Sequence, residues 1–325
     1  MNIELTLSIL AIPLGFALLV WSADRFVDGA SALANNLGVP PLIIGLTIVG
    51  FATSAPEMLI SAFAAWDGNS GLAVGNAIGS NITNVALILG FAALLYPIAV
   101  NSSILKKELP ILFAIMLLGS WMMLDQALTF EEGIIFIVAL FALMSWIVWQ
   151  GLSHPDDPIT QDAAEEIPTD MGTKTALFWL VIGLAVLLAS SKLLVWGAVN
   201  IAQAFGVSDL VIGLSIVALG TSLPELAATI SCVRKGESDI AVGNVIGSNM
   251  FNILGVLGIA AIISPTQLDS AVLQRDIPVM FAVALLLLFL SLCKGIKSPG
   301  LGKTGGAILT LSYLAYQGYL IYIST

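Results

Sequence analysis

Two acidic residues lie in the middle of long hydrophobic stretches, where charged side chains are rare. Glu57 lies within residues 41–66 and Glu225 within residues 209–233, and neither stretch has a basic residue at similar depth. A charged side chain at the centre of a bilayer costs about 3 kcal/mol or more unless something neutralises it. Two adjacent carboxylates in a low dielectric cannot both stay ionised without a counterion. A divalent cation would neutralise the pair.

Each of these glutamates directly follows a proline, Pro56 or Pro224. Proline lacks a backbone donor and disrupts a helix, which can free carbonyl groups one turn earlier. We therefore expect free carbonyl oxygens in residues 50–53 and 218–221, where they would add hard oxygen ligands to the carboxylates.

Asparagines and serines recur at four-residue spacing in two other hydrophobic stretches, which places them on one helix face. They are Asn76, Ser80 and Asn84 in the first half, and Asn244, Ser248 and Asn252 in the second. Neighbouring glycines at small-xxx-small spacing (Gly75, Gly79, Gly243 and Gly247) favour close helix contact, which would bring these side chains near the carboxylates. The alternative for any one of them is interhelical hydrogen bonding without an ion.

Carboxylate, amide, hydroxyl and carbonyl oxygens suit Ca²⁺ better than Mg²⁺, which requires a strict octahedron. Zinc binding and a histidine-based triad are poorly supported. Cys232 and Cys293 have no partner ligands at metal-site spacing, and the single histidine, His154, lies in a polar segment.

The chain repeats itself after a shift of 168 positions (221 minus 53). The matching segments are 53–57 with 221–225, 75–81 with 243–249, and 107–110 with 275–278. A duplication in a scaffold protein would preserve hydrophobicity, whereas here the polar and glycine-rich segments are the most similar. An odd number of spans in each unit would turn the second unit upside down.

The composition indicates an integral membrane protein, with 58% hydrophobic and 10% charged residues and a mean hydropathy of +1.01. We predict an all-α fold of ten transmembrane helices in two inverted five-helix repeats. The spans are expected near 4–24, 41–66, 71–95, 109–125, 133–152, 175–198, 209–233, 239–263, 277–293 and 304–323. The first repeat would cover residues 1–152, an acidic cytoplasmic linker 153–174, and the second repeat 175–325.

The net charge of −10 comes in good part from that linker, which we interpret as a solvated segment. Its acids are Asp156, Asp157, Asp162, Glu165, Glu166 and Asp170. There is no basic patch, so nucleic acid is not an expected partner. Membrane lipid is an expected partner, and no obligatory protein partner is evident.

Basic residues in the loops predict an N-terminus outside the cell. In that orientation about two basic residues remain outside and nine face the cytoplasm. The cytoplasmic residues are Arg25, Lys106, Lys107, Lys174, Arg234, Lys235, Lys294, Lys297 and Lys303. The first hydrophobic stretch is expected to be a mature helix and not a signal peptide, because residues 1–4 carry no positive charge.

With these paired motifs, the whole chain resembles the calcium/cation antiporter superfamily, and in particular its prokaryotic sodium/calcium exchanger-like members. The resemblance implies that Glu57 and Glu225 bind Ca²⁺ and share Na⁺, helped by backbone oxygens of Thr53 and Thr221. The positions implied as further ligands are Ser54, Ser80, Ser222 and Ser248 for sodium, and the carbonyls of Gly50 and Ala218. No cofactor is implied, and the location would be a prokaryotic inner membrane.

Asn84 and Asn252 match a central position where some family members carry an aspartate in one repeat. The absence of a third carboxylate leaves the coupling ion open between Na⁺, H⁺ and K⁺. We expect exchange of Ca²⁺ for Na⁺ by alternating access, with H⁺- or K⁺-coupled exchange as the alternative. An intramembrane hydrolase using two carboxylates is disfavoured, because both acids have nearly identical neighbours. A passive channel is disfavoured because the ring of repeated subunits expected of a channel is not evident.

One position breaks the symmetry, since Asp24 has Lys192 as its counterpart. These two could form a gating ion pair, although separate snorkelling to opposite interfaces is favoured.

Overall fold

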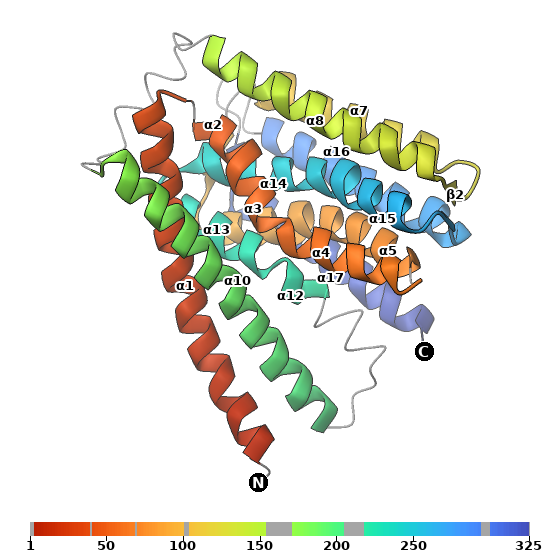
Figure 1. Cartoon of the computed structure of the whole chain (residues 1–325), viewed down its shortest axis with the longest axis horizontal. Coiled ribbons are helices and arrows are strands. Elements are labelled where there is room, and N and C mark those ends of the chain that lie inside the picture. The colour runs from red at the N-terminus through yellow and green to blue at the C-terminus, as the bar shows by residue number, and fades with distance from the viewer. Residues whose placement is uncertain are drawn as a thin grey trace.

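The computed structural model describes residues 3–39, 41–68, 70–100, 104–153, 171–204, 218–293 and 300–324 (Figure 1). The elements of the first half are α1 (Ile3–Leu37), α2 (Pro41–Ile44), η1 (Gly45–Val49), α3 (Gly50–Thr53), α4 (Ala55–Trp66), α5 (Ser70–Ile82), η2 (Thr83–Leu89), α6 (Gly90–Leu95), β1 (Ile98–Ala99), η3 (Ile104–Glu108), α7 (Leu109–Met122), β2 (Ala127–Leu128) and α8 (Phe130–Ser153), where η marks a π-helical turn. Those of the second half are α10 (Thr173–Ala204), α12 (Ala218–Thr221), α13 (Leu223–Arg234), α14 (Ser238–Phe251), η5 (Asn252–Val256), α15 (Leu257–Ile263), β3 (Thr266–Gln267), η6 (Val272–Asp276), α16 (Ile277–Leu292), β4 (Gly300–Leu301) and α17 (Lys303–Ser324).

In the described residues, six helices are long and apolar enough to cross a membrane. A seventh candidate joins residues 45–53 to α4 across a bend of 47°. The expected spans at 109–125 and 304–323 are present as α7 and α17 but are not among these six. Part of the span expected at 209–233 lies outside the described residues, as do His154 and the linker acids. The all-helical membrane fold is therefore confirmed, while the count of ten stays a prediction.

The internal repeat is visible in the elements themselves. The shift of 168 positions carries α3 onto α12, η3 onto η6 and β1 onto β3 without any change of bounds. The short strands pair across the two halves, β1 with β4 and β2 with β3, both antiparallel. The two halves are thus interlocked and do not form separate bodies.

Helices α5 and α14 lie at the centre of the molecule. The spans that contain them, residues 71–95 and 238–263, are 72% and 83% buried, against 28% for the span of α1 and 22% for that of α8. A buried helix can carry polar side chains because they face protein and not lipid. The central position of α5 and α14 therefore explains how the asparagine and serine stripes are tolerated.

Gly247, one of the glycines expected to allow close helix contact, does so in this centre. A Cβ atom on Gly247 would meet the backbone of Leu46 in η1, and one on Gly45 would lie 2.7 Å from the carbonyl oxygen of Ile240. The counterpart Gly79 has no described atom within 4 Å of such a Cβ. The segment that corresponds to η1, residues 213–217, lies outside the described residues, so the expectation for Gly79 stays untested.

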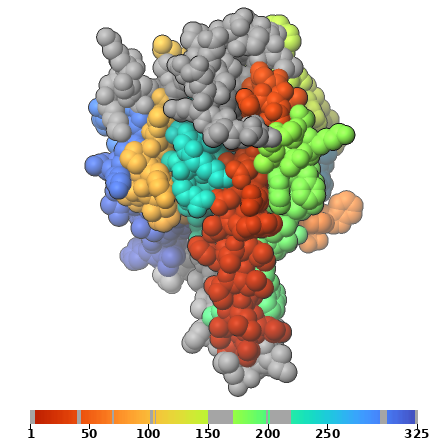
Figure 2. All heavy atoms as spheres, turned by 90° about the vertical axis from the view of Figure 1, so that its left-hand side faces the viewer, coloured from red at the N-terminus to blue at the C-terminus, as the bar shows by residue number. Residues whose placement is uncertain are grey.

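Helices α1 and α10 form a long antiparallel pair that projects from the rest of the body (Figures 1 and 2). Glycines on both helices make the crossing possible. An added Cβ on Gly29 would lie 2.5 Å from the backbone nitrogen of Leu180, and one on Gly183 would lie 2.6 Å from that of Phe26. Since backbone atoms cannot move aside as a flexible side chain can, these positions require glycine.

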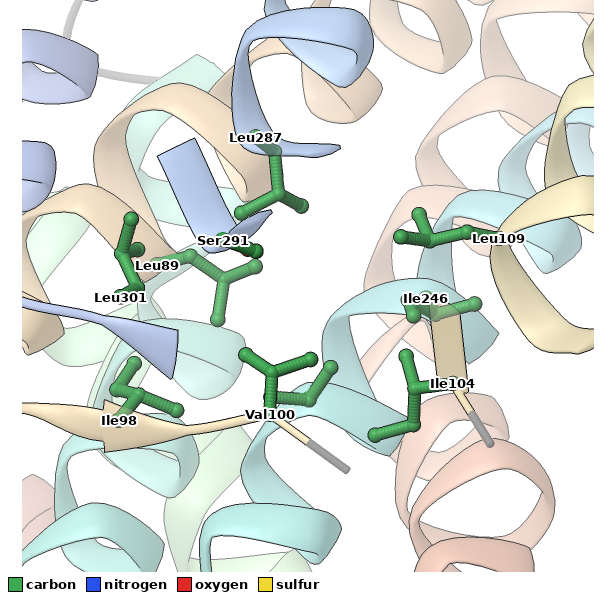
Figure 3. A pocket seen from close by; sticks show the side chains of 10 residues that line it. Leu89, Ile98, Val100, Ile104, Leu109, Ile246, Leu287, Ser291 and Leu301 are labelled. Carbon is green, nitrogen blue, oxygen red and sulfur yellow. The ribbon is translucent and has the colours of Figure 1, made fainter. Parts of the chain in front are cut away.

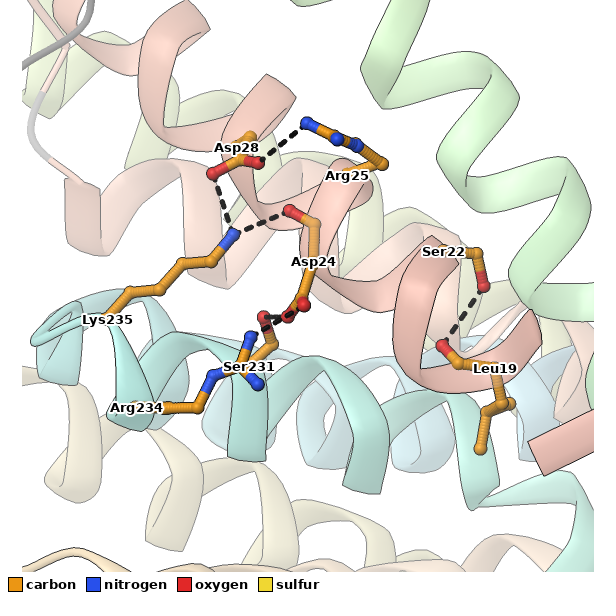
Figure 4. A network of polar contacts seen from close by, with 8 residues as sticks. All are labelled: Leu19, Ser22, Asp24, Arg25, Asp28, Ser231, Arg234 and Lys235. Atoms are coloured by element: carbon orange, nitrogen blue, oxygen red, sulfur yellow. Dashed lines mark hydrogen bonds and ion pairs between the residues drawn. The ribbon is translucent and has the colours of Figure 1, made fainter. Parts of the chain in front are cut away.

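A polar network joins α1 to the end of α13, and it corrects the expectation for Asp24 (Figure 4). The Asp24 carboxylate accepts hydrogen bonds from Arg234 Nη2 and Ser231 Oγ, each at 2.6 Å. Lys235 Nζ donates to the Asp24 carbonyl and to Asp28 Oδ1, both at 2.7 Å. Asp24 does not pair with Lys192, because the end of α13 brings Arg234 and Lys235 next to it. Snorkelling of the two residues to opposite interfaces stays a prediction. Lys192 is exposed.

A small pocket elsewhere in the molecule is almost entirely apolar (Figure 3). Ser291 is its single polar lining residue, among leucines, isoleucines and valines such as Leu89 and Ile246. None of the expected cation ligands is among its lining residues.

Changing Gly183 to alanine is expected to lower the thermal stability of the protein. The new methyl group would collide with the Phe26 backbone and push α1 and α10 apart, at a cost of about 1–3 kcal/mol for an overpacked site. The melting temperature of the detergent-purified protein measures the effect. Gly318→Ala in α17 is the matched control, because no described atom lies within 4 Å of its added Cβ. Equal melting temperatures for the two variants would contradict the packing argument.

Candidate cation-binding site

The two glutamates occupy equivalent places in the first turns of α4 and α13, and each is 1% exposed. Pro56 and Pro224 are tolerated there because the first turn of a helix does not need their missing N–H groups. The helix breaks two residues before each proline, at Ser54 and at Ser222, between the preceding short helix and the helix that carries the glutamate.

The break does not free the Gly50 carbonyl, contrary to expectation. The backbone N–H of Ser54 donates to it at 3.1 Å, and the hydroxyl of Ser248 donates to it at 3.4 Å. The bend falls at Ser54, so the last hydrogen bond of the preceding turn is still made. Ala218 begins α12 in the second half.

Each glutamate is contacted by a hydroxyl group from the other half of the chain. Ser54 Oγ donates to Glu225 Oε1, and Ser222 Oγ donates to Glu57 Oε1, both at 3.4 Å. This exchange of roles is the pattern that a pseudo-twofold axis produces. The fold thus brings together the two acidic motifs that are far apart in the sequence.

The second oxygen of each carboxylate, Glu57 Oε2 and Glu225 Oε2, is buried and has no hydrogen-bond partner among the described residues. Ion pairs in the described residues involve Asp24, Asp28 and Asp276, and none involves either glutamate. Buried polar atoms are nearly always paired, and an unpaired carboxylate oxygen is especially costly. These oxygens are available to a cation.

Asn84 and Asn252 supply two more oxygens of the same kind. Both side chains are 1% exposed, and both Oδ1 atoms are buried without a partner. Helix α4, which carries Glu57, packs against η5, which begins with Asn252, while α13 packs against η2, which contains Asn84. Two carboxylates and two amide oxygens therefore lie on touching elements, as hard ligands suited to Ca²⁺ or Na⁺.

Asn76 and Asn244 follow the alternative interpretation, interhelical hydrogen bonding. Asn76 Nδ2 donates to the carbonyl oxygen of Glu57 at 3.3 Å and to Ser61 Oγ at 2.9 Å. Asn244 Nδ2 does the same to the carbonyl of Glu225, at 3.5 Å, and to Thr229 Oγ1, at 3.1 Å. These amides hold the first turn of each glutamate helix against α5 or α14.

The remaining expected ligands are buried around this centre. Thr53 Oγ1 donates to Asn244 Oδ1 at 3.0 Å and lies 3.4 Å from Ser248 Oγ. Ser80 is 4% and Thr221 6% exposed. Ser80 belongs to α5, and Thr221 ends α12 next to Ser222, which donates to Glu57 Oε1.

The sequence analysis missed Asn81 and Asn249. They lie between the stripe positions, yet Asn249 Oδ1 accepts a hydrogen bond from Asn84 Nδ2 at 3.0 Å, and Asn81 Oδ1 accepts one from Asn252 Nδ2 at 3.4 Å. Their signal was present in the repeat, because both end the matching segments 75–81 and 243–249. The four-residue spacing drew attention to the stripe alone.

Comparison with known proteins agrees with this architecture. Residues 7–149 and 175–322 match the family described as sodium/calcium exchanger protein. The chain is 52% identical to the putative antiporter CaxA of Alkalimonas amylolytica over 95% of this chain and 97% of that protein. It is 33% identical to the sodium/calcium exchanger MaX1 of Methanosarcina acetivorans, covering 98% and 100% of the two chains.

Among solved structures, the sodium-calcium exchanger NCX_Mj soaked with zero Na⁺ and Ca²⁺ superposes with a TM-score of 0.83 at 28% identity, over 97% of this chain and 99% of that one. The inner membrane protein YrbG of Escherichia coli is 40% identical over 95% of both chains. The family match spans most of the chain, and the fold and the relatives agree with it. This multi-pass membrane protein belongs to the sodium/calcium exchanger protein family.

Proposed function

We propose that the protein is a secondary antiporter that exchanges Ca²⁺ for Na⁺ by alternating access. The observation that carries the proposal is a set of four buried acceptor oxygens, on Glu57, Glu225, Asn84 and Asn252, that have no donor in the part of the chain that the structure describes. They occur in two symmetry-related pairs, on elements that pack against one another. Relatives named antiporter and sodium/calcium exchanger support the same conclusion.

The coupling follows from the electrostatics of the empty site. No basic side chain is paired to either glutamate among the described residues. An empty carrier would therefore bury two uncompensated carboxylates while it passes through its closed state. The penalty for an unpaired buried charge is several kcal/mol. Only a carrier loaded with cations changes conformation readily, so one cation must replace another.

Sodium is supported as the counter-ion by the hydroxyl groups around the carboxylates. Ser54 and Ser222 each reach the glutamate of the other half, and the hydroxyls of Thr53, which precedes Ser54, and of Ser248 lie 3.4 Å apart. Neutral hydroxyl oxygens can complete the shell of a monovalent ion that shares a carboxylate. Ser80 and Thr221 belong to the same proposed set.

We also propose the membrane arrangement that this mechanism needs. Ten helices would form two inverted five-helix units, residues 1–152 and 175–325, joined by a cytoplasmic linker at 153–174, with the N-terminus outside in a prokaryotic inner membrane. The repeated element bounds support it, since inverted repeats provide the two access states of many transporters.

Flux measurements test the role of the carboxylates. In vesicles with an imposed Na⁺ gradient, wild-type protein is expected to move ⁴⁵Ca²⁺, and Glu57→Gln or Glu225→Gln to lower that flux at least about 30-fold. Losing one partner of a buried charge pair costs about 2–5 kcal/mol, and 1.4 kcal/mol is tenfold. Asp67→Asn is the control, because this acid is exposed beyond the end of α4. Unchanged flux in either glutamine variant would overturn the proposal.

Ion substitution tests the coupling. Ca²⁺ flux is expected to follow an imposed Na⁺ gradient and to vanish when K⁺ or choline replaces Na⁺, because the hydroxyl-rich site would accept Na⁺ in exchange. A pH gradient without Na⁺ should drive no flux. If it does drive flux, the proton-coupled alternative is correct and sodium coupling is wrong.

Cysteine labelling tests the orientation. In a background with Cys232→Ala and Cys293→Ser, an impermeant maleimide applied to intact cells is expected to label Asp125→Cys. Lys303→Cys should react only after the membrane is permeabilised. The native side chains of Asp125 and Lys303 are exposed, so access of the maleimide is limited by the membrane alone. The opposite labelling pattern would place the N-terminus inside.

A further inference from the structure

Asn81 and Asn249 make a crosswise pair of contacts that the cation ligands alone do not explain. Asn81, from α5, accepts from the amide of Asn252 in the other half, and Asn249, from α14, accepts from the amide of Asn84. Both are buried, at 1% and 2% exposure. Their oxygens are engaged with these amides, so they are poorly placed to be ligands themselves.

An asparagine amide can help a cation in only one of its two orientations. Its oxygen is an acceptor, while its NH₂ group is a donor and carries partial positive charge. The terminal torsion of asparagine is broad and roughly twofold, so the side chain alone does not select an orientation. A neighbouring group must hold the nitrogen for the oxygen to point into the site.

We propose that Asn81 and Asn249 are positioning residues that orient the amides of Asn252 and Asn84. By accepting a hydrogen bond from each Nδ2, they turn the corresponding Oδ1 to the opposite side, where it is buried and has no donor. This inference rests on the cation-binding role proposed above for Asn84 and Asn252.

Surrounding contacts support this assignment. Asn81 directs its own Nδ2 to the sulfur of Met280, at 3.6 Å, which leaves its oxygen for Asn252. Asn252 begins the π-helical turn η5, and Asn84 is the second residue of η2. Such turns recur at functional sites because they displace side chains from regular helical positions. Each half of the chain therefore orients a ligand that belongs to the other half.

The test is the Ca²⁺ concentration dependence of flux in Asn249→Leu, a variant of similar size without an acceptor. The KM for Ca²⁺ is expected to rise at least about fivefold, because the Asn84 amide loses its buried partner and no longer holds its oxygen toward the ion. The kcat should stay within about twofold of wild type if the amide contributes mainly to ion binding. Asn249→Asp keeps acceptor oxygens at the same place, so its KM should not exceed that of wild type.

A double-mutant cycle separates orientation from general damage. In an Asn84→Ala background there is no amide to orient, so adding Asn249→Leu should leave the KM unchanged. Asn200→Leu in α10 is the control for loss of an asparagine with a buried amide nitrogen, since Asn200 Nδ2 is buried without a partner among the described residues, and it should not alter the KM. Elution volume and melting temperature show whether each variant is folded.

The outcomes distinguish this inference from the proposed function. If Glu57→Gln abolishes flux while Asn249→Leu leaves the KM unchanged, the positioning role is wrong and the antiporter proposal stands. Equal KM increases from Asn249→Leu with and without Asn84→Ala, or a raised KM in Asn249→Asp, would also overturn it. If Asn249→Leu does not fold, the Asn249→Asp result and the equivalent cycle of Asn81→Leu with Asn252→Ala decide the question.

Discussion

The architecture depends on two carboxylates being buried together without a basic partner. Glu57 and Glu225 are almost fully inaccessible, and the ion pairs of the described residues lie elsewhere. One oxygen of each carboxylate is stabilised by a serine from the other half, and the second is left for a cation. A permanent lysine or arginine would make the fold more stable when empty, but it would compete with the transported ion. The proposed cation site depends on the lack of a basic partner for these carboxylates in the described part of the chain.

Symmetry is what allows such a site to be built from one motif used twice. A single copy supplies one glutamate, one set of hydroxyls and one amide stripe, and these face the complementary groups of the second copy. Hydrogen bonds at the centre therefore occur in pairs with the halves exchanged, as for Ser54 with Glu225 and Ser222 with Glu57. One departure from the symmetry is at Asp24 in α1, which is held by Arg234 and Ser231. That contact links the α1 and α10 pair to the body that holds the site.

Asparagines within one short motif have distinct roles because helical geometry points them in different directions. Asn76 braces the first turn of the helix that carries Glu57, while Asn84 leaves its oxygen unpaired. Asn81 lies between them in the sequence but contacts the opposite half of the chain. The polar stripe therefore holds more than one role, since the amides of Asn76 and Asn244 brace the first turns of the glutamate helices.

The amino-acid sequence by itself determined the membrane class, the internal repeat and the importance of Glu57 and Glu225. These follow from hydrophobic length, from the shift of 168 positions (221 minus 53) and from the cost of burying a charge, all of which are local or periodic properties of the chain. Only the tertiary structure decided which amide braces, which one orients and which one is left open, and that Asp24 pairs with Arg234 and not with Lys192. Those choices depend on which side chains from distant segments come within hydrogen-bonding distance. Spacing along one helix cannot specify its neighbours, because the partner of each side chain belongs to another element.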